Sequence, residues 1–214
     1  AYMIYTSGTT GKPKGVICTH VGPVNMLGLD GFFCHGTPGV DIVGCSAPVI
    51  FDVFVEGFFG SLGSGLAFSL DLKNCTVLVC TPSVAPLLLA DETNANIKLL
   101  SVAGEACPLG LDAASYHFLN RYGPTETYYC THSSSPSTIG RPLPNVLCYV
   151  VHPDNGELCP PGVSGELWIG GAGVSLGYHN RPELTAEKFI DNPFRGSSSN
   201  TVSSPGKVYK SGDR

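Results

Sequence analysis

A glycine-rich segment, YTSGTTGKPKG at residues 5–15, constrains the chain most strongly. It places three glycines, four small hydroxyl side chains and two lysines within eleven positions. Glycine lets a backbone adopt positive φ and approach a ligand closely. Backbone N–H groups, hydroxyls and ammonium groups are the donors that phosphate oxygens accept from. Apolar residues at 1–5 predict a buried strand before this loop, and residues 16–19 predict a second strand after it. The segment therefore predicts a phosphate-binding loop between two strands.

Two other interpretations compete for this loop. A P-loop needs four residues between its first glycine and the Gly-Lys pair, followed by Ser or Thr. Here Gly8 and Gly11 are separated by two residues, and Pro13 follows Lys12, so the spacing excludes a P-loop. Composition alone leaves a flexible surface turn as an equal alternative, because turns rich in Gly, Ser and Thr are common.

The composition limits the class of protein. Charged residues make up 14% of the chain, against about 25% in a typical domain, so we expect a piece of a larger protein whose other parts cover apolar faces. The net charge of −5 argues against bulk binding to nucleic acid. No apolar run is long enough to span a membrane. Nine cysteines without a CxxC pair favour reduced, buried thiols in a cytoplasmic protein over a zinc site or a disulfide framework.

The complete segment at 5–15 resembles the phosphate loop of the adenylate-forming, AMP-binding enzyme superfamily. This superfamily includes acyl-CoA synthetases, luciferases and the adenylation domains of nonribosomal peptide synthetases. The resemblance implies an α/β fold that forms part of the large N-terminal domain of such an enzyme, with a smaller β-rich subdomain. It implies ATP as cofactor, bound through Thr6, Ser7, Gly8, Thr9, Thr10, Gly11 and Lys12.

A second segment, NRYGPTE at residues 120–126, is similar to another motif of the family. The resemblance implies that Tyr122 stacks on adenine, that Thr125 contacts the α-phosphate and that Glu126 helps to hold Mg²⁺. Each role suits its residue type, since a phenol offers a π-face, a hydroxyl donates to phosphate and a carboxylate is a hard ligand. By itself the segment also matches a Gly-Pro turn that begins a helix.

Shorter matches complete the nucleotide site that the resemblance implies. Gly104-Glu105 follows a predicted strand at 98–103 and resembles the turn that borders the adenine pocket. YKSGD at 209–213 resembles the motif whose aspartate, here Asp213, accepts hydrogen bonds from both ribose hydroxyls. Each segment taken alone is an ordinary turn. It supports the resemblance because it occurs together with the other motifs and in the order that the family has. The resemblance adds to the nucleotide contacts Asn120 and Gly123.

Residues 51–62 carry apolar side chains at helical spacing and predict a helix. Asp52 and Glu56 lie one turn apart on it, and charges of this kind usually face solvent. However, FDVFV at 51–55 resembles the Phe-Asp-x-x-Val segment of peptide synthetase adenylation domains, whose Asp holds the α-ammonium of the substrate. A buried carboxylate needs a cationic partner, so Asp52 favours an amino acid over a fatty acid or an aryl acid.

Alignment to the family also implies which residues line the pocket for the substrate side chain: Val53, Glu56, Ala103, Arg121 and Tyr129. Glu56 would favour a cationic side chain such as ornithine or lysine. Arg121 would instead pair with Glu56 or favour an acidic substrate. These alternatives stay open at the level of the sequence.

The remaining elements follow from local patterns. We expect further strands at 41–48, 76–80, 146–152 and 165–170, helices beginning near Pro23 and covering 82–90 and 182–190, a hairpin turn at Asn155-Gly156 and a mobile Ser-rich segment at 196–205. Composition changes after residue 138. We therefore expect a partial α/β nucleotide- and substrate-binding core at 1–138 and a β-rich subdomain at 139–214. We expect the small C-terminal domain of the family, which carries a catalytic lysine, to be absent, and two intervals, at 70–74 and 130–139, to be shortened.

Together these features predict a fragment of an amino-acid-activating adenylation domain, an AMP-forming ligase impaired in this truncated form. It would join an amino acid to ATP with Mg²⁺ and pass the acyl group to the phosphopantetheine thiol of a carrier protein, among neighbouring synthetase domains. The alternatives are an acyl- or aryl-CoA ligase and a non-catalytic nucleotide-binding remnant. We expect no nucleic-acid or membrane partner.

Overall fold

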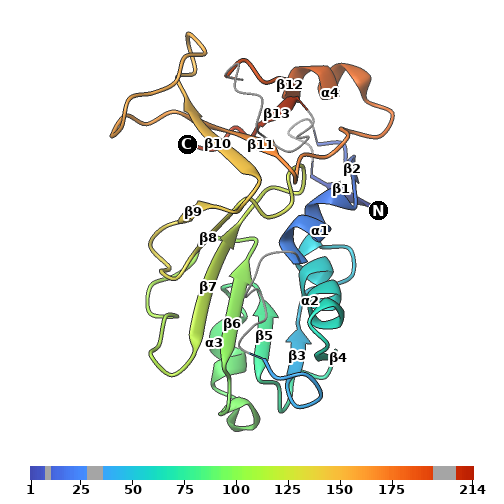
Figure 1. Ribbon diagram of the computed structural model, residues 1–214, viewed down its shortest axis with the longest axis vertical. Coiled ribbons are helices and arrows are strands. Elements are labelled where there is room, and N and C mark those ends of the chain that lie inside the picture. Colours follow the sequence, from blue (N-terminus) through green and yellow to red (C-terminus); the bar gives the residue numbers. More distant parts are fainter. Residues whose placement is uncertain (8–10, 28–35, 195–205) are drawn as a thin grey trace. The chain divides into compact units, whose positions relative to one another are not determined.

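The structure is a computed structural model that describes residues 1–7, 11–27, 36–194 and 206–214. The chain forms two compact units (Figure 1). Unit 1 comprises residues 1–25, 124–130 and 142–214, and unit 2 comprises residues 26–123 and 131–141. This division differs from the expected single boundary after residue 138, because the first strands pack with the C-terminal part of the chain. Gly8, Thr9, Thr10 and the predicted Ser-rich segment at 196–205 lie outside the described residues.

Unit 2 is built on a seven-stranded sheet with the order β4-β3-β5-β6-β7-β8-β9. Its strands are β3 (Ile42–Cys45), β4 (Ala67–Ser69), β5 (Val77–Cys80), β6 (Leu99–Ala103), β7 (His117–Tyr122), β8 (Thr131–Ser133) and β9 (Arg141–Pro142). The strands from β4 to β7 are parallel, whereas β7 and β8 are antiparallel. Every residue of β5 and β6 is buried, which confirms both predicted strands. Continuous apolar runs are typical of parallel strands covered on both faces.

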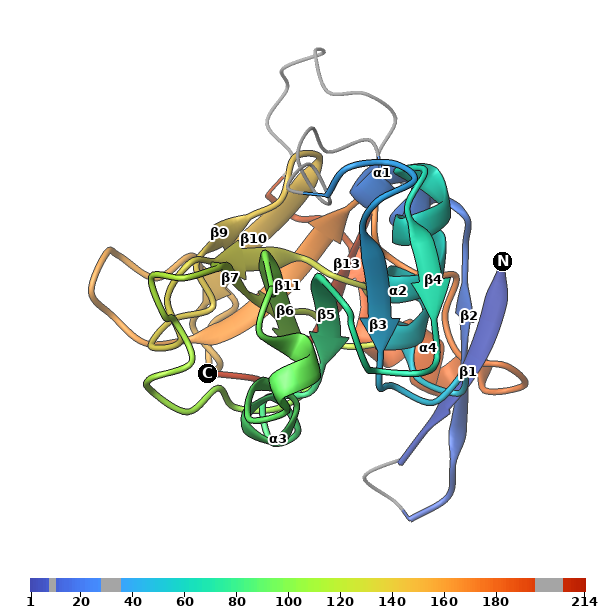
Figure 2. The same cartoon turned by 90° about the horizontal axis from the view of Figure 1, so that it is seen from below.

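Helix α2 (Asp52–Gly63) packs against β3, β4 and β5 (Figure 2). Gly57 permits this approach, because a Cβ at that position would lie 2.8 Å from the Cβ of Cys45. The helix confirms the periodicity of residues 51–62, but Asp52 and Glu56 are buried rather than solvated. Helix α3 (Ala85–Leu89) is shorter than predicted, since a turn in which the Val84 N–H donates to the Thr81 carbonyl precedes it. A short 3-10 helix follows at Glu92–Asn94.

Unit 1 begins with an antiparallel ribbon of β1 (Tyr2–Thr6) and β2 (Lys14–Cys18), in which Thr6 lies opposite Lys14. The ribbon confirms that strands flank the glycine-rich loop. The expectation that the first strand is buried is wrong for most of its length, because only Ile4 of β1 is fully buried. Helix α1 (Val21–Leu27) follows and begins two residues before Pro23.

The second sheet of unit 1 is antiparallel with the order β10-β11-β13-β12. Its elements are β10 (Val146–Val151), β11 (Glu166–Gly171), β12 (Phe189–Asp191), β13 (Lys207–Lys210) and helix α4 (Pro182–Lys188). The predicted turn at Asn155-Gly156 is present, with Gly156 at φ +72°. The predicted helix at 182–190 ends at Lys188, because Phe189 instead pairs with Tyr209 of β13. None of the helices in the described ranges combines the length and the hydropathy that a membrane span requires.

Candidate active site

The backbone of β2 holds a segment from the far end of the chain. Ile17 N–H donates to the Gly177 carbonyl at 2.9 Å, and His179 N–H donates to the Gly15 carbonyl at 2.7 Å. Val16 also forms a β-bridge with Tyr178. Residues 176–179 therefore act as a third strand beside β2, and this pairing brings Tyr178 next to Lys14.

Residues 124–130 pack into the same unit through close backbone contacts. Ser175 N–H donates to the Glu126 carbonyl at 2.9 Å, and the Cys18 thiol lies 3.6 Å from the Thr125 carbonyl oxygen. Gly173 approaches so closely that a Cβ there would lie 1.9 Å from the Thr127 carbonyl oxygen. These contacts fix the position of Glu126 relative to β2.

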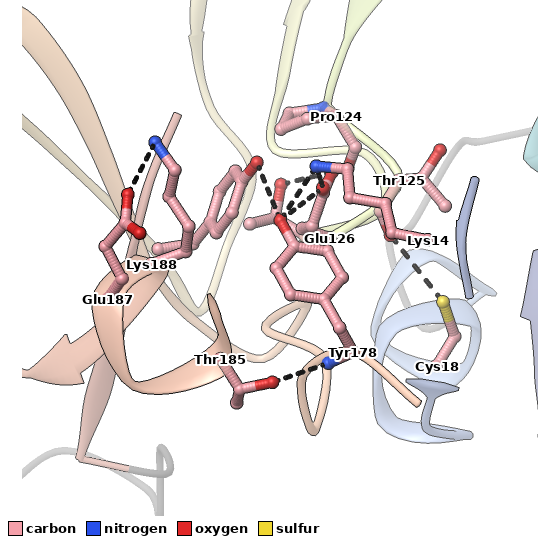
Figure 3. A network of polar contacts seen from close by, with 11 residues as sticks. Lys14, Cys18, Pro124, Thr125, Glu126, Tyr178, Thr185, Glu187 and Lys188 are labelled. Carbon is pink, nitrogen blue, oxygen red and sulfur yellow. Dashed lines mark hydrogen bonds and ion pairs between the residues drawn. The ribbon is translucent and has the colours of Figure 1, made fainter. Parts of the chain in front are cut away.

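Lys14, Glu126 and Tyr178 form a compact polar cluster (Figure 3). The Lys14 ammonium lies 2.7 Å from Glu126 Oε1 and donates to the Tyr178 hydroxyl at 2.9 Å. The Tyr178 hydroxyl in turn donates to Glu126 Oε1 at 2.7 Å. The Glu126 side chain is 5% exposed and that of Lys14 is 17% exposed. One carboxylate oxygen thus accepts from an ammonium and from a phenol in a setting largely shielded from water.

The protonation states of the cluster follow from its contacts. Burial alone would raise the pKa of the Glu126 carboxyl, but the hydrogen bonds from Lys14 and Tyr178 outweigh it and the pKa lies below its ordinary value. Burial, together with the nearby Glu126 carboxylate, raises the pKa of the Tyr178 and Tyr209 phenols. At neutral pH Glu126 is therefore a carboxylate, ion-paired with Lys14, and the Tyr178 phenol is neutral.

The structure distinguishes between the two lysines of the glycine-rich loop. Lys12, which we assigned to the phosphates, is exposed, whereas Lys14 makes the ion pair with Glu126. Thr6 ends β1, Ser7 is exposed, and Gly11 adopts φ +77°, a conformation that favours glycine. The motif gave no means of choosing between the lysines. Tyr178 was missed because its partner Glu126 is 52 residues away and no local pattern links them.

The predicted ribose motif lies at the end of β13 in unit 1. Gly212 N–H donates to Glu166 Oε1 at 3.0 Å, and the Ser211 hydroxyl donates to the Leu167 carbonyl at 2.6 Å. Asp213 N–H donates to the Ser211 hydroxyl at 3.0 Å. Asp213 itself is exposed. The turn is thus held by β11, and Asp213 lies beyond it at the surface of unit 1.

In unit 2, the predicted substrate residues include a buried ionic network. Arg121 Nε lies 3.1 Å from Glu56 Oε1, and both side chains are at most 1% exposed. The Ser101 hydroxyl donates to Glu56 Oε1 at 2.7 Å and accepts from Arg121 Nε at 3.0 Å. Of the alternatives open at the level of the sequence, the structure realises the pairing of Arg121 with Glu56. Sequence reasoning did not include Ser101, although it lies two residues before Ala103 on β6 and so on the same face.

The other predicted residues of unit 2 lie at the carboxyl ends of neighbouring strands or at the start of α2. Ala103 ends β6 and Tyr122 ends β7, and ligands of open α/β sheets bind beyond such strand ends. Asp52 begins α2, where the positive end of the helix dipole stabilises a carboxylate. The exposure of these predicted residues varies. Those that are buried are Asp52, Val53, Ala103 and Asn120. Tyr122 and Gly123 are half-buried, and Gly104 and Glu105 are exposed.

Two predicted residues of unit 2 make contacts of a structural kind. The Asn120 amide donates to the Thr138 carbonyl at 3.0 Å, and the Glu105 carboxylate accepts from Ser83 N–H at 3.2 Å. The predicted pocket residue Tyr129 is buried in unit 1, which also contains Thr125, Glu126 and Asp213. Each unit therefore holds a separate part of the predicted constellation: the predicted phosphate, magnesium and ribose residues and Tyr129 belong to unit 1, and the predicted adenine contacts and the other predicted substrate residues belong to unit 2.

The chain matches one family model and several known synthetases. The family model of AMP-binding enzymes matches residues 1–179. Tyrocidine synthase 1 from Brevibacillus parabrevis is 37% identical over 243 aligned positions, which cover the whole chain and 21% of that protein. The nonribosomal peptide synthetase pboA from Aspergillus ustus is 36% identical over 233 positions, which cover the whole chain and 11% of that protein. Both alignments are longer than the 214 residues of this chain, so the relatives contain segments that it lacks.

Solved structures agree with this result. The N-terminal subdomain of NpsA from Klebsiella oxytoca, in complex with 3-hydroxyanthranilyl-AMSN, matches with a TM-score of 0.77 at 28% identity. The match covers 98% of this chain and 60% of that one. This likeness confirms the expected α/β fold of the N-terminal part of an adenylation domain. The chain spans 60% of that subdomain and about a fifth or less of the two synthetases.

Proposed function

Because the chain belongs to the AMP-binding enzyme family, we propose that it is part of an amino-acid-activating adenylation domain. In the proposed reaction, the substrate carboxylate attacks the α-phosphorus of ATP and gives an aminoacyl adenylate and pyrophosphate. The phosphopantetheine thiol of a carrier protein then takes the acyl group. The likeness to tyrocidine synthase 1 and to the synthetase pboA supports the carrier protein and neighbouring synthetase domains as partners.

The observation that carries the proposal is the cluster of Lys14, Glu126 and Tyr178 beside the glycine-rich loop. Two anions meet when a carboxylate attacks a triphosphate, so the site must offset their repulsion with positive charge. Lys14 follows directly on the glycine-rich turn, and its ammonium is held in place by Glu126 and Tyr178. We assign the loop at 6–12, with Lys12, to the β/γ-phosphates and Thr125 to the α-phosphate, and Lys14 to holding Glu126 ionised and in place.

The cluster also fits a magnesium ion that arrives with the nucleotide. Within the described ranges, no three carboxylate, imidazole or thiol side chains gather as a protein-only metal site would require. Mg²⁺ usually binds through one or two carboxylates, water and substrate phosphates. Glu126 is a buried carboxylate whose lowered pKa keeps it ionised. Bound there, Mg²⁺ would neutralise phosphate charge, and Glu126 would be its protein ligand.

The buried ionic network of unit 2 bears on the substrate. Asp52 is assigned to the α-ammonium of the amino acid, which would compensate its buried charge. Glu56 is already neutralised by Arg121, so a charged substrate side chain beside them would remain uncompensated. We therefore infer an uncharged side chain, in place of the cationic one that Glu56 alone suggested.

An aryl-acid ligase is the second candidate, because the similar NpsA subdomain was solved with an aryl adenylate analogue. An aryl acid without an ammonium group gives Asp52 no partner. Amino-acid-dependent ATP–pyrophosphate exchange in the natural protein that carries this chain separates the two candidates. We expect uncharged amino acids to support exchange and Asp52→Asn to reduce it about 10-fold or more. Exchange with aryl acids that Asp52→Asn leaves unchanged would favour the second candidate.

Nucleotide binding can be tested on the 214-residue chain itself. Calorimetry with a non-hydrolysable ATP analogue and Mg²⁺ should detect binding that Glu126→Gln weakens about 10-fold or more, since an amide is a poor magnesium ligand. Glu187→Gln, on the exposed side of α4, is the matched control and should bind as the unaltered chain does. Equal binding by Glu126→Gln and the unaltered chain, or no binding by either, would contradict the assignment.

A further inference from the structure

Unit 1 contains a cavity of about 810 Å³ that the proposed reaction does not use. Its described lining comes from residues 172–178, from residues 180–189, which include α4, from Lys207, and from Thr19 and Val21 at the junction of β2 and α1. All of these residues belong to unit 1. Small-molecule sites usually enclose about 300–1,000 Å³. The cavity therefore has the size of a ligand site within one compact unit.

Hydrogen bonds hold the walls of this cavity in place. Leu176 N–H donates to the Ile17 carbonyl at 3.0 Å, which fixes one wall to β2. The Thr185 hydroxyl of α4 accepts from Tyr178 N–H at 2.9 Å (Figure 3) and donates to the Arg181 carbonyl at 2.9 Å. These bonds tie α4 to the segment at 176–179. The cavity is thus formed by the fold itself and does not depend on a ligand for its shape.

The walls are largely apolar, and part of this apolar surface is open to solvent. Val174 and Phe189 are buried, whereas Val21 is 53% exposed and Leu176 is 70% exposed. Apolar side chains that are exposed singly are ordinary, but exposed apolar side chains that gather around a hollow are typical of binding sites. The body of a ligand that fits these walls is therefore apolar.

The polar groups of the lining favour a negatively charged group. Arg181 and Lys207 both line the cavity, and the described lining residues include no carboxylate. Lys207 pairs with Asp191 at 3.0 Å, but that carboxylate is 90% exposed, so the pair is weak. Ser175 also lines the cavity, and its buried hydroxyl has no hydrogen-bond partner among the described residues. Buried hydroxyls usually have such a partner, and a ligand oxygen would supply one.

We propose that this cavity binds a small molecule with an apolar body and one anionic group, of the class of medium-chain carboxylates. The apolar body contacts Val174, Leu176 and Phe189, and the anionic group pairs with Arg181 or Lys207. None of the residues that we assign to the nucleotide or to the amino acid lines the cavity. The site is therefore a second one, and it does not depend on the proposed function.

Three probes separate the contributions of charge and of apolar body. Octanoate has both, 1-octanol has the same apolar chain without the charge, and acetate has the charge without the chain. In a nuclear magnetic resonance titration of the isotope-labelled 214-residue chain, octanoate should shift backbone amides of residues 172–189 in a saturable way. Acetate should produce no saturable shift, since an exposed charge pair alone contributes little. Absence of binding by octanoate, or shifts confined to other parts of the chain, would overturn the proposal.

Variants of the lining locate the site. Arg181→Gln should weaken octanoate about 3-fold, the usual effect of a partly exposed charge pair, and should leave 1-octanol unchanged. Lys188→Gln is the matched control, because Lys188 belongs to α4 but does not line the cavity, and it should bind both probes as the unaltered chain does. Equal weakening of octanoate by the two variants would show that only the net charge matters and would contradict the site.

A further variant fills the cavity. Ala186 is an exposed lining residue of α4, so Ala186→Trp adds volume without replacing a core side chain. It should abolish the binding of octanoate and of 1-octanol alike, and unchanged binding would overturn the proposal. If Ala186→Trp does not fold, the comparison of Arg181→Gln with Lys188→Gln decides. These readouts involve no nucleotide, so their failure is distinguishable from failure of the proposed function.

Discussion

The Glu126 side chain combines burial with charge. A carboxylate moved from water into a protein interior loses hydration, and this loss is tolerated when a cation and hydrogen-bond donors replace it. Lys14 and Tyr178 do so at 2.7 Å each. Lys14 and Tyr178 thus stabilise the ionised form of Glu126, which is the form that a metal ligand requires in the proposed reaction.

Replacement of Lys14 by Met should destabilise unit 1. The Glu126 carboxylate would remain buried without its cationic partner, and removal of one partner of a buried pair costs roughly 3 kcal/mol. Urea unfolding at pH 7 measures this loss. It should shrink at lower pH, because the pKa of Glu126 rises without Lys14 and the carboxyl becomes protonated. Lys12→Met, at an exposed position two residues away, should stay within about 0.5 kcal/mol of the unaltered chain. Equal losses for both variants would show that the Lys14–Glu126 pair adds no stability.

At the scale of elements, backbone pairing assembles the site. The strand-like segment at 176–179 pairs with β2, and Gly173 and Ser175 of the preceding turn contact the backbone of residues 126 and 127. Glycine at position 173 is required by space, since any side chain there would overlap the Thr127 carbonyl.

Gly173→Ala should therefore displace residues 124–130 and lower stability by about 3 kcal/mol, as overpacking does when backbone must move. Gly162→Ala is the matched control. Gly162 has φ +87° and no atom within 4 Å of an added Cβ, so alanine there should cost only about 1 kcal/mol of backbone strain. Thermal unfolding of both variants measures the difference. A Gly173→Ala chain as stable as the control would mean that the turn relaxes without cost.

At the scale of the whole molecule, each unit contains a buried acid whose stabilising contacts depend on ionisation. Burial tends to raise the pKa of Asp41 in unit 2, but Lys98, 2.8 Å away, and hydrogen bonds from Thr37 and Thr76 lower it from 3.8 to about 2. The folded state thus binds the proton less tightly than the unfolded chain. The contribution of the Asp41 carboxylate to the stability of the fold is therefore complete above pH 3.8 and is lost as the pH falls towards 2. The pKa of Glu126 in unit 1 is also lowered, so its contribution to stability is likewise lost as the pH falls.

Asp41→Asn should accordingly lower the free energy of unfolding by about 2 kcal/mol at pH 7, the usual loss for a charged, buried hydrogen-bond acceptor. The difference from the unaltered chain should shrink as the pH falls from 3.8 towards 2, because Asp41 becomes protonated in the unaltered chain as well. Thermal melts between pH 2 and pH 7 measure this convergence. Asp191→Asn removes an ion pair whose carboxylate is 90% exposed and should change stability by less than about 1 kcal/mol throughout. A constant difference for Asp41→Asn across this range would contradict the assigned linkage.

The sequence by itself determined the features that depend on neighbouring residues. The helical period at 51–62 predicted α2, the continuous apolar runs predicted β5 and β6, and Asn155-Gly156 predicted a turn, because each pattern is fixed by local backbone geometry. The ungapped motif at 5–15 indicated the family for a similar reason, since a phosphate-binding loop needs its donors at set spacings.

Only the tertiary structure decided which distant groups meet. It paired Lys14, and not Lys12, with Glu126, joined Tyr178 to Glu126 across 52 residues and balanced Glu56 with Arg121 in a buried pair. It also placed the first strands with the C-terminal sheet rather than with the α/β core. Side-chain pairing across long separations depends on strand register and on which faces are buried together. Neither the register of the strands nor the choice of buried faces can be read from a short stretch of sequence, because both arise from the packing of the entire unit.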